Sequence, residues 1–125
     1  MIIEYDWYTK EIIRSNPKVL FVFGDNTIRS GLGGQAKVCR GESNVFGIAT
    51  KKAPYSFFDG GLDDWIVLLS DLSSLMKLAK RYPIGWPRDG VGTGLAELDK
   101  RCPDMFKLIE HAKKVIDREK NVEPV

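Results

Sequence analysis

Two glycine-rich stretches hold the residues of this sequence that are best suited to chemistry. The first covers residues 24–36 and reads GDNTIRSGLGGQA, and the second covers residues 87–95 and reads PRDGVGTGL. Each follows a short apolar run and leads into a segment of helical composition. A strand, a glycine loop and a helix start together present backbone N–H groups to phosphate. Two such loops at comparable strand ends therefore predict a site for an extended ligand such as a diphosphate.

Asp25 and Asn26 begin the first loop, directly after the apolar run 19–23. Ligands of open α/β sheets bind at the carboxyl ends of strands. An Asn side chain both donates and accepts, which suits a ribose hydroxyl, and an Asp carboxylate accepts from a ribose hydroxyl or an adenine amine. Gly-Asp-Asn is also a turn-forming sequence. Ligand contact and turn formation both remain open for this pair.

The glycines themselves also have two interpretations. Gly31, Gly33 and Gly34 either let the backbone approach a phosphate closely or permit positive φ. In the second loop, glycines alternate with Val91 and Thr93, so the loop either wraps a phosphate with its amides or is a flexible surface turn. Neither loop carries Gly-Lys-Ser/Thr or G-x-G-x-x-G. The sequence thus argues against a P-loop nucleotide hydrolase and against Rossmann-type redox chemistry.

Few side chains are candidates for catalysis. Asp89, inside the second loop, could orient a water at an anomeric carbon or form a salt bridge with a neighbouring cation. Lys51 follows a predicted strand and is either a site residue or a solvated lysine. His111 is the only histidine and lies in a predicted helix far from both loops, so no Ser-His-Asp or Cys-His system can be assembled. Cys39 suits a buried core position.

Alternating strands and helices are predicted to position these loops. Apolar runs predict strands at residues 1–5, 19–23, 44–50 and 82–86, the first of them at a sheet edge. Helices are predicted at residues 8–15, 32–39, 62–81 and from 102 onward. The alternation predicts an α/β protein with a largely parallel sheet.

Apolar spacing predicts the buried faces of the two long helices. For the helix at 62–81 the expected positions are Trp65, Leu69, Leu72, Met76 and Ala79. For the last helix they are Phe106, Ile109, Ala112 or Lys113, and Ile116.

Residues 51–61 are predicted to form a loop. Its aromatic residues Tyr55, Phe57 and Phe58 could stack on adenine or ribose, or pack beneath the loop.

Composition limits the class of protein. At 125 residues we expect a single domain, with the tail from about residue 118 to 125 frayed. The net charge of +2 is too mild to indicate nucleic-acid binding, and no apolar run approaches the ~18 residues of a membrane span. Glu4 and Asp6 argue against a signal peptide. The two cysteines, Cys39 and Cys102, have no metal-type spacing and make no disulfide framework, so we expect reduced thiols and a cytoplasmic protein.

The order of the motifs resembles a macrodomain, the ADP-ribose-binding α/β module. Macrodomains carry an Asn- or Asp-containing segment that runs into a glycine loop, and a later strand that ends in a second glycine-rich phosphate loop. The similarity is closest to the small branch of terminal ADP-ribose protein glycohydrolases and ADP-ribose-1″-phosphatases. That branch has a stretch similar to residues 48–52, IATKK, and a Pro-Arg before the second loop. The chain also resembles small uncharacterised phage and bacterial proteins with the patterns FVFGDN and GGQA.

This resemblance covers residues 19–116 and implies a three-layer α/β/α macrodomain-like fold with a mostly parallel mixed sheet, as one domain over residues 1–125. It implies that the ligand is ADP-ribose or a related ADP-ribosyl nucleotide, free or attached to a protein. The pocket would need no metal or cofactor, and neither nucleic acid nor membrane is an expected partner. The expected ligand contacts are Asp25, Asn26, Gly31, Gly33, Gly34, Gln35, Ala36, Arg88, Gly90, Val91, Gly92, Thr93, Gly94 and Leu95.

The resemblance leaves catalysis open. In the glycohydrolases a lysine of the Thr-Lys-Lys stretch attacks the sugar, and an aspartate just after the second loop's glycines assists. Lys51 matches the lysine, but Ala96 stands at the position of the acid, followed by Glu97. A lysine nucleophile must lose its proton, which needs a nearby base or a depressed pKa.

With Ala96 in place of the acid, three hypotheses about the function remain open. The first is hydrolysis of an ADP-ribosyl or ADP-ribose-1″-phosphate bond, with Lys51, Asp89 and Asp25 as candidate catalytic residues. The second is a non-catalytic protein that reads or sequesters an ADP-ribose-type nucleotide signal. The third is an interaction protein whose glycines are structural turns.

Overall fold

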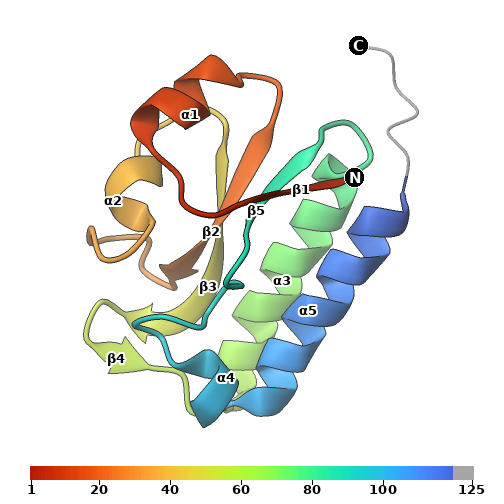
Figure 1. Ribbon diagram of the computed structural model, residues 1–125. Helices are drawn as coiled ribbons and strands as arrows, with labels where there is room; N and C mark the ends of the chain where they lie inside the picture. Colours follow the sequence, from red (N-terminus) through yellow and green to blue (C-terminus); the bar gives the residue numbers. More distant parts are fainter. Residues whose placement is uncertain (120–125) are drawn as a thin grey trace.

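The computed structural model describes residues 1–119 as an α/β protein built on one five-stranded mixed sheet (Figure 1). The spatial order is β1-β5-β2-β3-β4, so β1 lies at an edge as predicted. The first four strands in this order are parallel, and β4 runs antiparallel to β3. The strands are β1 (Ile2–Tyr5), β2 (Leu20–Asn26), β3 (Val45–Ala53), β4 (Ser56–Phe57) and β5 (Ile84–Pro87).

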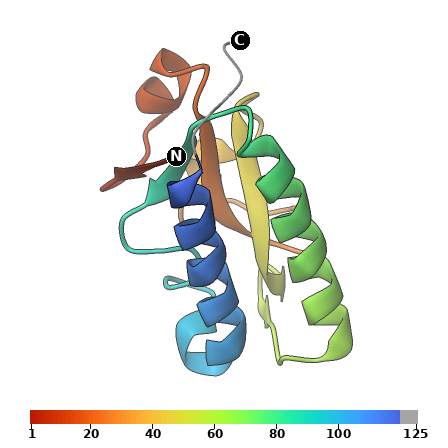
Figure 2. The same cartoon turned by 90° about the vertical axis from the view of Figure 1, so that its right-hand side faces the viewer.

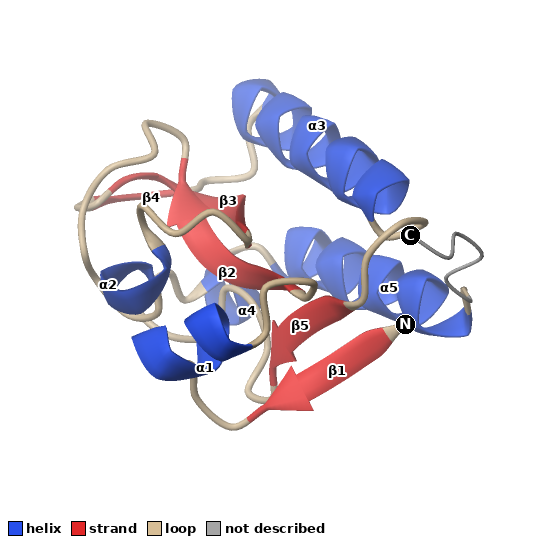
Figure 3. Ribbon diagram, turned by 90° about the horizontal axis from the view of Figure 1, so that it is seen from above, coloured by secondary structure: helices blue, strands red, loops and turns tan. Residues whose placement is uncertain are grey.

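Helices cover both faces of this sheet. Seen from above, α3 and α5 lie on one side and α1 and α2 on the other (Figure 3). The two long helices, α3 and α5, lie side by side and run in the same direction (Figure 2). The helices are α1 (Lys10–Ser15), α2 (Ala36–Cys39), α3 (Leu62–Leu78), α4 (Leu98–Arg101) and α5 (Pro103–Arg118).

Two apolar clusters hold these layers to the sheet. The larger one packs Ile48 and Trp86 of the sheet against Leu75 of α3 and Ile109 of α5. The smaller one lies under α1 and α2 and includes Phe21, Phe23, Tyr8 and Cys39. Strand β2 therefore has a core on both faces, with Val22 in the larger cluster and Phe21 and Phe23 in the smaller one, which explains the continuous apolar run in its sequence.

The predicted buried face of α3 is confirmed except at one position. Leu72 and Ala79 are buried, and Trp65 and Met76 pack against the core, but Leu69 is 51% exposed, and Leu68 and Leu75 are fully buried. Asp64 anchors the first turn of the helix, since its buried carboxylate accepts the backbone N–H groups of residues 59 and 60 and the ammonium of Lys52. These bonds fix which side of the first turn faces the sheet.

Other predicted boundaries also shift. Strand β3 continues to Ala53 and pairs with β4, so part of the predicted loop 51–61 is a β-hairpin. In α5, Met105 is buried and Phe106 only partly so. The short helix α4 was not predicted. Fraying was expected from about residue 118 to 125. Helix α5 ends at Arg118, and residues 120–125 lie outside the described part of the chain.

The predicted helix at 32–39 is shorter than expected, since α2 begins at Ala36. Gly34 has a φ of +57°, outside the right-handed helical region, so the helix cannot extend back through it. Residues 27–35 instead form an irregular loop between β2 and α2.

Candidate functional site

Both glycine loops line one cleft of about 440 Å³. Its floor comes from the carboxyl ends of parallel strands, with Asp25 of β2, Thr50 of β3 and Pro87 of β5. This volume lies within the range of small-molecule sites. The predicted site residues that line the cleft are Asp25, Asn26, Gly31, Gly33, Gly34, Gln35, Ala36, Lys51, Asp89, Gly90, Gly92, Thr93, Gly94 and Leu95.

The two loops meet although they are about sixty residues apart in sequence. A Cβ atom built on Gly33 would lie 3.0 Å from Cδ1 of Leu95, and one built on Gly24 would lie 3.6 Å from the backbone nitrogen of Gly92. A Cβ on Gly94 would have no neighbour within 4 Å. The loops thus approach each other closely at these two points, and the backbone of Gly94 borders open space.

Backbone N–H groups are the main unused donors of the cleft. Within the part of the chain that the structure describes, those of residues 31–35 and 91–96 donate no hydrogen bond. Two predicted donors are already used, since the N–H of Ala36 donates to Gly33 O and that of Gly90 to Pro87 O. Helix α2 has only four residues, so any anion binding here depends on the loops rather than on a helix dipole.

Asn26 shapes the first loop with its side chain. Its Nδ2 donates to the carbonyl of Ser30 over 2.6 Å, and its Oδ1 accepts the N–H of Ser30 over 3.3 Å. The turn interpretation of Gly-Asp-Asn therefore describes Asn26 in this structure. One hydrogen of Nδ2 and one lone pair of Oδ1 remain for a ligand, but Asn26 is only 7% exposed.

Asp25 forms an ion pair with Arg40 at the base of the cleft. The Arg40 guanidinium donates to both carboxylate oxygens, over 2.6 and 3.3 Å, and its Nε donates to the carbonyl of Gly31. The Asp25 side chain is only 4% exposed. Its carboxylate therefore holds Arg40 and the loop in place and is poorly available as a general base.

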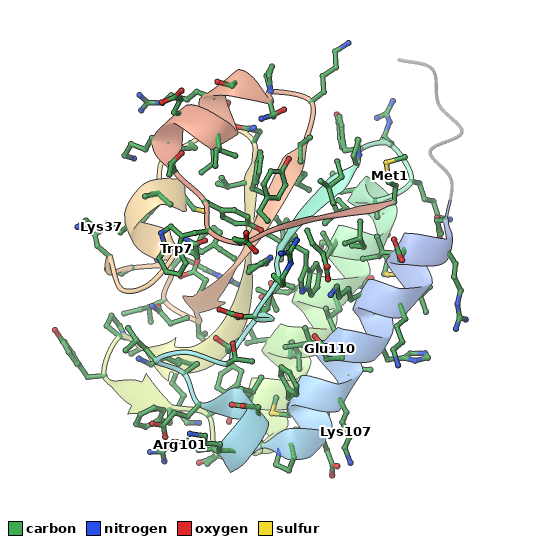
Figure 4. All side chains as sticks on the ribbon, in the orientation of Figure 1. Met1, Trp7, Lys37, Arg101, Lys107 and Glu110 are labelled. Atoms are coloured by element: carbon green, nitrogen blue, oxygen red, sulfur yellow. The ribbon has the colours of Figure 1, made fainter. Side chains whose placement is uncertain are left out.

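Lys51 lies in the cleft but is anchored at its edge. Its Nζ donates to the carbonyl of Pro54 and lies 5.4 Å from the centroid of the Phe57 ring. The guanidinium of Arg101, labelled in Figure 4, stacks on the same ring at 3.5 Å. Of the three aromatic residues considered for stacking, Tyr55 is 98% exposed and lines the cleft, whereas Phe58 is buried in the core.

The carboxylates near the cleft differ in availability. Asp89 lines it, is exposed, and its carboxylate makes no hydrogen bond or ion pair within residues 1–119. Asp6, which the sequence analysis did not select, also lines it and pairs with Arg88. Glu97 pairs with Arg101 and does not line the cleft, while Ala96 does.

Two predicted contacts are not among the residues that line the cleft. Arg88 lines a separate cleft beside β1 and α5, and its guanidinium pairs with Asp6 and lies 4.0 Å from Glu4. Val91 is almost fully buried in the larger core cluster. The residues that line the cleft without having been predicted include Asp6, Trp7, Ser30, Leu32, Arg40 and Thr50.

Trp7 is the most conspicuous of the residues that the sequence did not indicate. It follows the edge strand β1, is 58% exposed, and lies near α2 (Figure 4). Hydrogen bonding of the next residue explains its position, because the N–H of Tyr8 donates to Oε1 of Gln35. No motif marks Trp7, since its place in the cleft depends on the pairing of β1 with β5 and on the bond between Tyr8 and Gln35, which join residues far apart in the sequence.

Other reactive groups lie away from the cleft. Burial raises the pKa of the Cys39 thiol to about 12, which fits the predicted core role and not that of a nucleophile. His111 is exposed on α5. Among residues 1–119 no cluster of His, Cys, Asp and Glu could hold a metal ion, and no helix there is long and apolar enough to span a bilayer.

The fold and the cleft define an α/β protein whose candidate site is formed by two glycine loops at one edge of a mostly parallel sheet. A family model, described as a family of unknown function (DUF7831), matches residues 3–112. The match spans most of the chain, so the protein belongs to this family. Comparison with curated proteins and with solved structures gave no match.

Proposed function

We propose that this chain has a macrodomain-like fold and binds ADP-ribose or a related ADP-ribosyl nucleotide in the cleft between its glycine loops. One observation carries the proposal: two runs of backbone N–H groups, residues 31–35 and 92–96, donate no hydrogen bond within residues 1–119 and border the same cleft. Phosphate oxygens are strong acceptors for such groups. A ligand with two phosphates could use both runs at once.

The rest of the cleft is compatible with the rest of such a ligand. Trp7 and Tyr55 place exposed aromatic rings at its border, where a nucleobase or ribose can stack. Arg40 and Lys51 supply positive charge near the loops. In this proposal the ligand is free ADP-ribose or the ADP-ribosyl group of a modified protein.

Binding without turnover is the form of the proposal that the side chains support best. Ala96 lines the cleft where the glycohydrolases have an acid, and the carboxylate of the next residue, Glu97, pairs with Arg101. Asp25 is held by Arg40. This arrangement suits a protein that reads or sequesters an ADP-ribose-type signal.

Hydrolysis is the second candidate, and Asp89 is the observation that favours it. Its exposed carboxylate lies in the cleft without a partner in the described residues, so it could orient a water at the anomeric carbon. Lys51 would then stabilise or attack the sugar, provided it first releases Pro54.

Calorimetric titration with ADP-ribose, together with thermal unfolding, tests the binding proposal. We expect binding heat and a rise in Tm, since ligand at about 100 times Kd stabilises a protein by about 2.7 kcal/mol. Absence of both at millimolar ADP-ribose would overturn it.

Turnover is tested separately on ADP-ribosylated protein and on ADP-ribose-1″-phosphate. A reader or sequesterer gives no release of ADP-ribose or phosphate. If products appear, Lys51→Ala and Asp89→Ala identify the participants, and a variant with unchanged rate removes its residue from the mechanism.

A further inference from the structure

Arg40 is the arginine whose guanidinium lines the cleft. Of the five N–H groups of a guanidinium, three are used, two toward Asp25 and one toward the carbonyl of Gly31. Two donors remain, and the side chain is 24% exposed. A rigid, charged group with spare donors is thus already fixed beside the free amides of the first loop.

We infer that Arg40 binds a phosphate of the ligand and that Asp25 positions Arg40 instead of contacting the ligand. The identity of the ligand rests on the proposed function, but the anion site itself does not. Guanidinium groups that are held by a carboxylate and a carbonyl on one side lose little conformational entropy when they bind an anion on the other.

The other charged residues of the cleft also favour an anion at the first loop. Lys51, the other cation that lines it, is anchored to Pro54 at the β3–β4 hairpin. Asp89 belongs to the second loop and has no partner in the described residues, so it repels a phosphate from its own position. The charge of Asp25 is compensated by Arg40 and Arg29, and that of Asp6 by Arg88, which leaves the first loop as the favourable place for an anion.

Arg29, in the first glycine loop, offers a matched control. Its guanidinium pairs with Asp71 of α3, donates to the carbonyl of Gly47, and lies 3.9 Å from Oδ2 of Asp25. It does not line the cleft. Arg40→Gln and Arg29→Gln therefore remove the same kinds of contact and one positive charge each, but only the first alters the proposed anion site.

The experiment is calorimetric titration of the wild type and both variants with ADP-ribose and with inorganic pyrophosphate, at low and high salt. We expect Arg40→Gln to weaken binding of each probe about 10- to 100-fold and to reduce the salt dependence of Kd. Arg29→Gln is expected to stay within about threefold of the wild type. Equal losses in the two variants, or no loss in folded Arg40→Gln, would overturn the inference.

A double-mutant cycle separates the two roles of Asp25. Asp25→Asn replaces one acceptor of the Arg40 guanidinium with a donor, so the inference expects weaker binding of pyrophosphate in the wild-type background and no further loss in Arg40→Gln. A loss of the same size in both backgrounds would mean that Asp25 acts on the ligand independently of Arg40. Should Arg40→Gln not fold, Arg40→Lys keeps a cation near Asp25 but loses the planar fork, and we expect it also to weaken binding about tenfold or more.

The two proposals fail in different ways. Wild type that binds pyrophosphate but not ADP-ribose would overturn the proposed function and leave the Arg40 site standing. If the wild type binds ADP-ribose and substitution of Arg40 has no effect, the Arg40 inference would be overturned and the proposed function would stand. Binding of neither probe would overturn both.

Discussion

At the scale of single residues, Asp25 fits into the sheet only because Gly47, two residues before its register partner Ala49 on β3, has no side chain. A Cβ atom on Gly47 would lie 2.6 Å from Oδ2 and 2.9 Å from Cβ of Asp25, closer than real Cβ contacts. The space that a side chain would occupy is filled by the carboxylate that holds Arg40. Gly47 is therefore part of the support of the cleft although it does not line it.

Gly47→Ala tests this packing. We expect a loss of about 1–3 kcal/mol in the free energy of unfolding, because Asp25 must move from its place between the strands. Urea unfolding measures the change. Gly94→Ala is the control, since its Cβ would meet nothing within 4 Å and its φ is not in the left-handed region. A similar loss in both variants would contradict this account of Gly47.

The ion pair between Glu42 and Arg14 makes the stability of the fold depend on pH. Hydrogen bonds from the Arg14 guanidinium lower the pKa of the Glu42 carboxyl below its usual range. A carboxyl whose pKa is lower when folded stabilises the protein above its unfolded pKa, and this contribution is lost as the pH falls through the folded pKa. Glu42→Gln should therefore lower stability at neutral pH more than in acid.

Urea unfolding near pH 7 and near pH 3 checks this expectation. Glu11→Gln, which removes an exposed negative charge from α1 that no ion pair within residues 1–119 uses, is the control for net charge. A loss of equal size at both pH values in Glu42→Gln would show that the Arg14 pair contributes nothing.

At the scale of elements, α3 shows why one position of a buried face, here Leu69, can be misjudged from sequence. The helix carries apolar residues on most of its sides, so more than one stripe satisfies the helical spacing. The choice between stripes depends on Asp64, whose buried carboxylate binds the preceding loop and Lys52. A polar anchor of this kind leaves no mark in hydrophobic periodicity.

Neighbouring leucines of α3 test the observed face directly. Leu68→Ala should lower the free energy of unfolding by about 2–5 kcal/mol, because it opens a cavity in the larger core cluster. Leu69→Ala should change it by no more than about 0.5 kcal/mol, since that side chain is half exposed. The reverse order, measured by chemical denaturation, would favour the face predicted from the sequence.

The first glycine loop can be tested as an element with a pair of glycines. Gly34 and Gly41 both have positive φ, and a Cβ on either would have no neighbour within 4 Å. Only Gly34 lines the cleft. Alanine at either position should cost about 1–2 kcal/mol of stability through backbone strain.

Their effects on binding should differ. Gly34→Ala adds a methyl group at the cleft and disturbs the free amides, so we expect the Kd for ADP-ribose to rise about tenfold, or ~1.4 kcal/mol. Gly41→Ala should leave Kd within about twofold. Titration calorimetry below the melting temperature of both variants provides the comparison, and equal Kd values would exclude the first loop from binding.

At the scale of the whole molecule, sheet order decides how much of the site the sequence could predict. The α/β class, the edge position of β1 and the gathering of both glycine loops follow from apolar runs and from the rule that parallel strands end at one edge. Asp6 and Trp7 reach the cleft because β1 pairs with β5. Each residue of β1 has its partner 82 positions further along the sequence. Periodicity within one segment carries no information on such pairing.

Arg40 was missed for a related reason. Its pairing with Asp25 spans fifteen residues and depends on the irregular path of the loop between β2 and α2. That path in turn is set by hydrogen bonds of Asn26 to Ser30 and by positive φ at Arg29 and Gly34. Side-chain contacts across an irregular loop follow from its three-dimensional course, which spacing in the sequence does not determine.

The joint action of two distant loops is the property that belongs to the molecule as a whole. Since the N–H groups of residues 31–35 and 91–96 donate no hydrogen bond in the described part of the chain, they should exchange hydrogen rapidly in the free protein. A ligand with two phosphates that bridges the loops should slow exchange in both runs together.

Residues 41–44, outside the cleft, serve as the internal control and should exchange at the same rate with and without ligand. Amide exchange followed by mass spectrometry, with saturating ADP-ribose, provides the measurement. Protection of one run alone would place the ligand on a single loop, and calorimetric binding without protection of either would place it outside the cleft.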